Sequence, residues 1–144
     1  MLGYLDSSLD ADAFDDEGYF RTGDLAMVDD AGYLTITGRL KDVIIRNMEN
    51  ISAREIENLA LTFPRAAETA VIALPDPETG ERVCAVVVPA DPMDPPTLDE
   101  LVAHLRAEGL NPRKLPVQLE YVSELPRNAM NKVVKKTLKD QFVR

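Results

Sequence analysis

Apolar residues along the chain form short runs and helical stripes that are separated by turn residues. Residues 83–88 are continuously apolar, which is typical of a strand buried on both faces. Residues 70–74 predict a neighbouring strand, and residues 117–122 alternate as a third strand would. The pattern therefore predicts one small sheet of three strands.

Three helices are predicted beside this sheet. Ser52 and Glu55 are spaced as a capping box at the start of the first helix, and Thr97 and Glu100 repeat this spacing at the start of the second. The expected helices cover residues 51–61, 97–105 and 132–142. Strands and helices in this order indicate a small α+β sandwich.

The first part of the chain has a different pattern. Five of the seven glycines precede residue 39, whereas no proline precedes Pro64. Residues 29–32 lie between two apolar stretches and predict a hairpin, with Gly32 at a positive φ. We therefore expect a β-rich segment over residues 1–40 and an α+β domain over residues 41–144, in which helices flank a three-stranded sheet plus a β-hairpin.

Composition narrows the classes of partner. The 25 acidic and 16 basic residues give a net charge of −9, which disfavours nucleic acid because phosphate binding needs surplus Lys and Arg. The single cysteine, Cys84, reads as a core residue and leaves no multi-cysteine metal site, and we expect no metal site in the chain. No apolar run approaches the length of a membrane span, so we predict no integral membrane segment and a cytoplasmic location.

The charge is unevenly distributed. Residues 1–38 contain nine acids and one base, whereas residues 127–144 contain six bases and one acid. The chain thus has one locally positive end, where an anionic reactant would be stabilised.

Asp24 is the first candidate for chemistry. It follows Gly23, whose backbone lets a ligand approach closely. A carboxylate there can accept hydrogen bonds from two hydroxyls, as acidic residues do for a ribose. The alternative is an Asx-turn with a purely structural role.

Two further polar clusters are candidates. Residues 38–42 carry three charges at the composition boundary and are either a hinge or a solvated linker. Lys132 precedes a predicted helix, where an ammonium can move onto a phosphate or an oxyanion. The alternative is a solvated basic helix face, to which we assign three other lysines: Lys135, Lys136 and Lys139.

Taken together, these clusters resemble three motifs of the adenylate-forming superfamily, which includes acyl-CoA synthetases, luciferases and the adenylation domains of peptide synthetases. Residues 18–25 read GYFRTGDL, and residues 38–44 read GRLKDVI. The latter run on to ENIS at residues 49–52 and EIE at residues 55–57. LPR at residues 125–127, followed by Lys132, is similar to the closing motif. The order and spacing of the motifs agree with those of the superfamily over nearly the whole chain. The sequences GRLKD and ENIS are most similar to those of fatty-acid–CoA ligases.

The resemblance implies roles in adenylation. Asp24 would bind the ribose hydroxyls of ATP, Arg39 would assist at the ribose or the phosphates, and Lys132 would contact the substrate carboxylate and the α-phosphate. Lys41 would lie at the hinge about which a C-terminal domain rotates between two half-reactions.

The rotation would then present a second face for thioester formation with CoA. That face comprises Asn47, Met48, Glu49 and Asn50. The family often has glycine at the positions of Asn47 and Met48, and glycine before the catalytic lysine, where this chain has Asn131. The bulk of Met48 therefore raises the question whether thioester formation proceeds by the usual route.

The resemblance also implies ATP, Mg²⁺ bound mainly by an N-terminal domain, CoA as co-substrate and a small carboxylate as substrate. Residues 1–40 would be the end of that N-terminal domain, which this sequence otherwise lacks, so we expect a fragment that has no turnover alone. A lipid substrate would allow peripheral membrane association. Two alternatives stay open: a non-catalytic binding or regulatory module of the same fold, and an adenylation enzyme that uses another acceptor.

Overall fold

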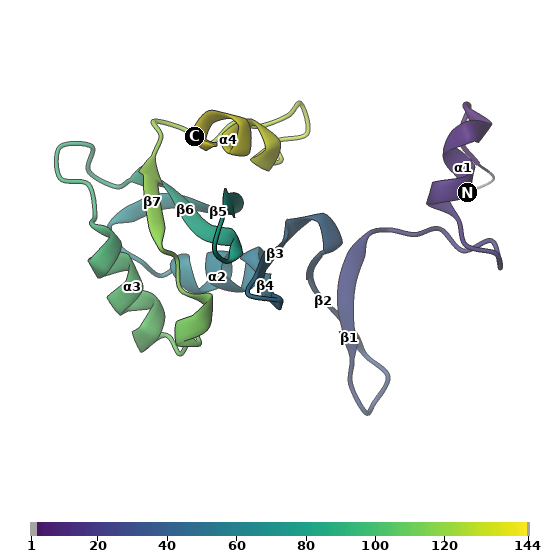
Figure 1. Cartoon of the computed structure of the whole chain (residues 1–144), viewed down its shortest axis with the longest axis horizontal. Coiled ribbons are helices and arrows are strands. Elements are labelled where there is room, and N and C mark those ends of the chain that lie inside the picture. Colours follow the sequence, from purple (N-terminus) through teal and green to yellow (C-terminus); the bar gives the residue numbers. More distant parts are fainter. Residues whose placement is uncertain (1–2, 144) are drawn as a thin grey trace. The chain divides into compact units, whose positions relative to one another are not determined.

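The computed structural model describes residues 3–143. The chain divides into two compact units, with the boundary between Lys41 and Asp42. We call them unit 1 and unit 2 and describe each by itself (Figure 1).

Unit 1 is built around one antiparallel hairpin. The carboxylate of Asp29 accepts the N–H groups of Ala31 at 3.0 Å and Tyr33 at 2.9 Å, and Gly32 has a φ of +84°. These contacts turn the chain as the sequence predicts. The elements of unit 1 are η1 (Ser7–Leu9), α1 (Asp10–Ala13), β1 (Asp24–Val28), β2 (Leu34–Arg39) and η2 (Leu40–Asp42), the last of which ends in unit 2.

Unit 2 is an α+β domain, as predicted. Its five-stranded sheet has the order β4-β3-β6-β5, and β7 pairs in parallel with β6. The elements are β3 (Val43–Arg46), β4 (Glu49–Ser52), α2 (Ala53–Ala60), β5 (Ala66–Asp76), β6 (Gly80–Pro89), α3 (Leu98–Ala107), η3 (Pro112–Lys114), β7 (Gln118–Tyr121) and α4 (Lys135–Phe142). Within the described residues, no helix is long and apolar enough to cross a membrane.

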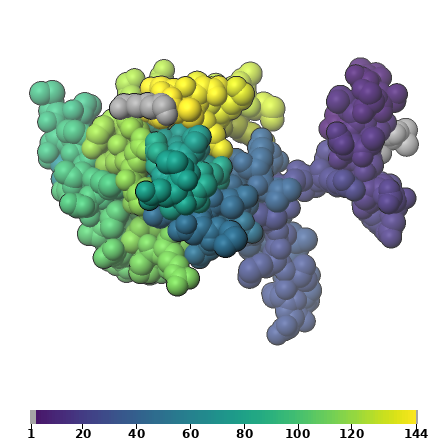
Figure 2. All heavy atoms as spheres, viewed as in Figure 1, coloured from purple at the N-terminus to yellow at the C-terminus, as the bar shows by residue number. Residues whose placement is uncertain are grey.

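The strands β5 and β6 are buried on both faces, so the continuous apolar run is confirmed as a doubly covered strand. Alternate residues point to opposite sides. Val83 and Ala85 join a core with residues of α2 and α3, whereas Cys84 and Val86 join a second core with Leu138 of α4 and others. Figure 1 accordingly shows α4 on one side of the sheet and α2 and α3 on the other. The exposed turn between β5 and β6 is visible in teal at the surface in Figure 2.

The sheet has five strands, because a hairpin joins the predicted three strands in one sheet. The additional strands form a hairpin, β3–β4, which joins the other strands through the single pair Arg46↔Gly80. No strand was predicted at residues 49–52, because Ser52 carries the helix-start signal. That signal is genuine, since the Ser52 hydroxyl accepts the N–H of Glu55 at 3.3 Å, but α2 begins only at Ala53. The last helix likewise begins at Lys135 instead of Lys132.

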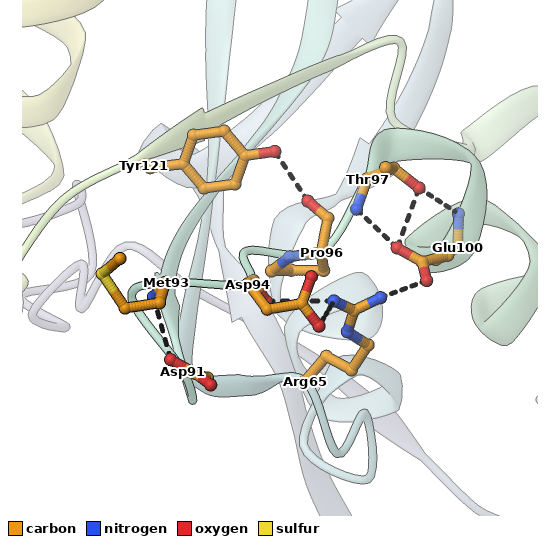
Figure 3. Close-up of polar contacts among 8 residues, drawn as sticks. All are labelled: Arg65, Asp91, Met93, Asp94, Pro96, Thr97, Glu100 and Tyr121. Atoms are coloured by element: carbon orange, nitrogen blue, oxygen red, sulfur yellow. Dashed lines mark hydrogen bonds and ion pairs between the residues drawn. The ribbon is translucent and has the colours of Figure 1, made fainter.

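A polar network fixes the start of α3 (Figure 3). Thr97 and Glu100 form the predicted capping box, and Glu100 also pairs with Arg65 at the start of β5. Arg65 pairs in turn with Asp94 at 2.7 Å, and the hydroxyl of Tyr121 donates to the carbonyl of Pro96 at 2.6 Å. The proline-rich loop before α3 is therefore held to both β5 and β7.

The network predicts a pH dependence of the stability of unit 2. The N–H of Thr97, then its hydroxyl, and the charge of Arg65 lower the pKa of Glu100. A carboxyl whose pKa is lower in the folded state contributes stability above its unfolded pKa and loses it as the pH falls through the folded one. Glu100→Gln should therefore reduce the loss of urea stability between about pH 6 and pH 3.

The matched control for this experiment is Glu108→Gln. Glu108 is exposed at the C-terminal end of the same helix, and its carboxylate has no recorded bond within residues 3–143. The control should retain the parental pH dependence. Equal slopes for the parent and Glu100→Gln would contradict the prediction.

Candidate functional site

Asp24 and Arg39 face each other across the hairpin of unit 1. They are the first pair of the β1–β2 register, and Nε of Arg39 lies 2.7 Å from Oδ1 of Asp24. The Thr22 hydroxyl accepts the N–H of Asp24 at 3.1 Å. The side chain of Thr22 thus stabilises the turn at residues 22–24. The Asp24 carboxylate is therefore engaged in an ion pair with Arg39.

A hollow of about 410 Å³ adjoins this pair. It is lined by Thr22, Gly23, Arg39, Leu40 and Lys41. Gly23 has a φ of +72°, and a Cβ added there would meet no heavy atom within 4 Å. Its carbonyl accepts the N–H of Leu40 at 2.8 Å, which ties the start of η2 to the turn. Arg39 and Lys41 thus line a hollow beside the open backbone of Gly23, and Asp24 is linked to it through its ion pair with Arg39.

The predicted second face lies on the hairpin of unit 2. Asn47 and Met48 are its two turn residues, with φ values of +51° and +62°, between the paired residues Arg46 and Glu49. Two left-handed residues in such a loop are typical of a type I′ turn. The Met48 side chain is 97% exposed. Asn50 follows in β4, so all four predicted residues lie on this one hairpin.

A second hollow, of about 300 Å³, opens beside this turn. It is lined by Arg46, Asn47 and Glu49 of the hairpin together with Pro112 and Arg113 of η3. No sequence pattern predicted this hollow, because Arg113 is distant in sequence from the hairpin and belongs to no motif.

Lys132 lies in a tightly bonded loop. The side-chain oxygen of Asn128 accepts the N–H groups of Met130 at 3.0 Å and Lys132 at 2.9 Å. Asn131 has a φ of +61°, and its carbonyl accepts a bond from Arg127 at 3.0 Å. The backbone beside Lys132 is therefore fixed, although the side chain is exposed.

The Lys132 ammonium has no recorded ion pair or hydrogen bond among the residues that the structure describes. Three other lysines, in contrast, are paired with carboxylates at 2.8 Å: Lys114, Lys135 and Lys136. Lys132 thus has a hydrogen-bonded backbone and an exposed ammonium group that is available to an anionic ligand. In Figure 1 its loop, just before α4, and the β3–β4 hairpin lie at separate places on unit 2.

The left-handed residues coincide with these candidate segments. Within residues 3–143, the non-glycine residues with a positive φ are Asn47, Met48 and Asn131. Such residues are strained and tend to cluster at functional sites. Asn tolerates the conformation, but Met does not, so the strain is greatest at Met48.

Lys135 and Cys84 are both largely shielded from solvent. Lys135 was assigned to a solvated face, and this is wrong, because its side chain is only 18% exposed and pairs with Glu57 of α2. Cys84 is buried as predicted, and burial, with a smaller effect of Glu120, raises the pKa of its thiol to about 12. A thiol with such a pKa is a poor nucleophile.

Residues 55–132 match the family described as the AMP-binding enzyme C-terminal domain. The chain is also 40% identical over 145 residues to the medium-chain fatty-acid–CoA ligase of Escherichia coli K12, covering all of this chain and 26% of that protein. It spans about a quarter of the length of the curated relatives that it matches.

The chain is also similar in fold to solved structures of larger enzymes. ATP-bound MatB from Rhodopseudomonas palustris superposes with a TM-score of 0.81 at 36% identity, over 92% of this chain and 26% of that one. The amide bond synthetase McbA from Marinactinospora thermotolerans has a TM-score of 0.84 at 33% identity, over 98% of this chain and 28% of that one.

The strain at Met48 yields a stability prediction. Met48→Gly should raise the free energy of unfolding by about 0.5–1 kcal/mol, because removal of the left-handed penalty outweighs the added chain entropy of glycine. Denaturant unfolding of unit 2 would measure the change.

Met93→Gly is the matched control. Met93 is a methionine that is 91% exposed in a loop and lacks a positive φ. Glycine there should be neutral or destabilising. A Met48→Gly variant no more stable than the parent would contradict the prediction.

Proposed function

The chain belongs to the adenylate-forming enzymes and carries the C-terminal domain of AMP-binding enzymes. From this membership we propose that it is the mobile C-terminal part of an ATP-dependent acyl-CoA ligase. Such an enzyme activates a carboxylate as an acyl-adenylate and transfers the acyl group to CoA. The observation that carries the proposal is Lys132, an exposed cation on a hydrogen-bonded loop, with no recorded ion pair in the described part of the chain.

Lys132 would act in the first half-reaction. When a carboxylate attacks the α-phosphate of ATP, negative charge gathers on the phosphoryl oxygens and on the two reacting groups. A lysine ammonium within hydrogen-bond distance offsets this charge, and its effect is largest where water is excluded. Because Lys132 has no recorded ion pair with residues 3–143, its ammonium would lose none of these contacts on moving to the reactants.

Asp24 and Arg39 would hold the nucleotide. The Asp24 carboxylate would accept hydrogen bonds from the ribose hydroxyls, while the Arg39 guanidinium, bonded to Asp24 through Nε, would orient that carboxylate and face the ribose or the phosphates. The open backbone at Gly23 supports this arrangement, because no side chain blocks the hollow there.

We propose that residues 1–40 end an N-terminal domain and that residues 41–144 form the mobile domain, with Lys41 at the hinge. The division of the chain between Lys41 and Asp42 supports this boundary. So does the apolar surface of unit 1, where Val28, Leu34 and others are more than 60% exposed on the hairpin and would be covered by further protein.

The β3–β4 hairpin would serve the second half-reaction. We propose that rotation brings the turn of Asn47 and Met48, with Glu49 and Asn50, toward the acyl-adenylate and the pantetheine arm of CoA. The Met48 side chain would then lie in the path of the thiol, and its flexibility would allow it to move aside.

A fatty acid is the proposed acyl substrate, and the similarity to a medium-chain fatty-acid–CoA ligase supports it. The similarity to an amide bond synthetase favours a second candidate, in which the same adenylate is transferred to an acceptor other than CoA. The chain would work in the cytoplasm with ATP and CoA. Mg²⁺ is assigned to no residue here, because residues 3–143 contain no group of three side chains that could hold a metal ion.

The role of Lys132 can be tested in the ligase that contains this chain. Lys132→Ala should lower the rate of ATP–pyrophosphate exchange with fatty acid by about 100-fold or more, because a stabilising charge is lost from the transition state. Lys139→Ala, on the next helix, is the control and should retain exchange. Normal adenylation by Lys132→Ala would refute the assignment. Pyrophosphate exchange by the isolated 144-residue chain would instead refute the proposal that adenylation needs a further N-terminal domain.

Met48 should affect the other half-reaction. Met48→Gly should leave pyrophosphate exchange unchanged and speed thioester formation from a supplied acyl-adenylate by a few-fold, because the side chain no longer has to move aside. Single-turnover measurements with CoA would separate the two steps. An unchanged thioester rate would show that Met48 does not obstruct the thiol.

A further inference from the structure

The EIE motif at residues 55–57 contains two glutamates to which the adenylation reaction gives no role. Both lie on α2, and both form ion pairs with residues far along the chain. Glu55 binds Lys114 of η3 at 2.8 Å, and Glu57 binds Lys135, the first residue of α4, at 2.8 Å. The second pair leads directly to the loop that carries Lys132.

Glu57 also makes a backbone contact. Its Oε1 accepts the N–H of Val71 in β5 at 2.8 Å. Among the strands of the described sheet, β5 pairs only with β6, so this N–H points out of a free edge. Glu57 therefore replaces the missing neighbour of the strand, and this fixes its carboxylate in place.

The same carboxylate reaches both sides of the sheet. α2 covers one face and α4 covers the other, and Glu57 connects them around the edge of β5. The pair is largely shielded, with side-chain exposures of 23% for Glu57 and 18% for Lys135. A shielded ion pair with a further hydrogen bond is more sensitive to the loss of one partner than a surface pair.

The start of α4 needs such support. Its N-cap, Val134, makes no side-chain capping bond, and its first turn contains no acidic residue but begins with two lysines. Cations at a helix N-terminus interact unfavourably with the helix dipole. An anion supplied by another helix compensates for this, and Lys132 lies only three residues before Lys135.

We propose that Glu57 is a positioning residue for Lys132: through Lys135 it fixes the first turn of α4, and with it the loop that presents the Lys132 ammonium. This inference rests on the proposed adenylation role of Lys132. It also gives the EIE motif a function, because it ties the helix of one motif to the loop of another.

Amide hydrogen exchange on the 144-residue chain tests the tether without reference to activity. Glu57→Gln keeps an oxygen for the N–H of Val71 but removes the charge, and Lys135→Met removes the other partner. Each should speed exchange at Lys132 and Val134 by about tenfold, and the double variant should add little, because both break the same interaction.

Glu55→Gln is the matched control, two residues earlier on the same helix. It should speed exchange near Arg113 and Lys114 but leave Lys132 as in the parent. Unchanged exchange at Lys132 in Glu57→Gln and Lys135→Met would overturn the proposal. A uniform loss of protection through β5 and β6 would also overturn it, because it would show general destabilisation.

The ligase that contains the chain provides the second readout. Glu57→Gln should lower kcat for adenylation by about tenfold with little change in KM for ATP, and should leave thioester formation from a supplied acyl-adenylate unchanged. Equal loss in both half-reactions would overturn positioning. Normal adenylation by Lys132→Ala would refute the proposed function instead, while the exchange result would still decide whether the tether exists.

Discussion

Burial of β5 and β6 on both faces is the constraint on which the structure of unit 2 depends. A strand pair with Val71, Ala73, Val83 and Ala85 on one side, and an equally apolar set on the other, cannot leave either side in water. Helices must cover both faces, and the chain has to pass from one face to the other to supply them. The loop that carries Lys132 is such a connection, between β7 and α4, so it lies at the surface but is flanked by the buried residues Leu125 and Leu138.

The same constraint explains why charged side chains hold the sheet edges. β5 lacks a partner on its outer edge within the described sheet, and Glu57 accepts one of its N–H groups. β3 pairs with β6 at a single residue pair. In a longer ladder a backbone carbonyl would accept the N–H of Ile45, but here the carboxylate of Glu81 accepts it at 2.6 Å. Carboxylates therefore complete the backbone bonding that the short strands leave open. They also join segments that are distant in sequence.

Much of this arrangement could be predicted from the sequence, because local rules act on local patterns. The apolar run at residues 83–88 and the capping box of Thr97 and Glu100 depend on neighbours in the chain, and the structure confirms both. The strand β4 was missed, because its turn is formed by Asn47 and Met48 and lacks the glycine that marks most such hairpins. The burial of Lys135 was missed too, because its partner lies 78 residues earlier. The sequence motifs located the segments of the candidate site. The spacing of residues in the sequence could not show which charged side chains are already paired with one another.

The pairing of charges bears on how the proposed mobile domain would work. Lys132 is flanked by Leu125 and Leu138, which are 5% and 0% exposed, and its loop is further fixed by Asn128. The hairpin that carries Met48 is part of the same sheet, through β3. Two rigid segments of one body cannot exchange places by rearranging loops. If each serves a different half-reaction, unit 2 has to turn as a whole, and the φ and ψ changes must fall in the short connection at residues 40–42, where the chain leaves the hairpin of unit 1. Under the proposed function, Lys41 would then mark the pivot of that connection, because everything beyond it would move with the sheet.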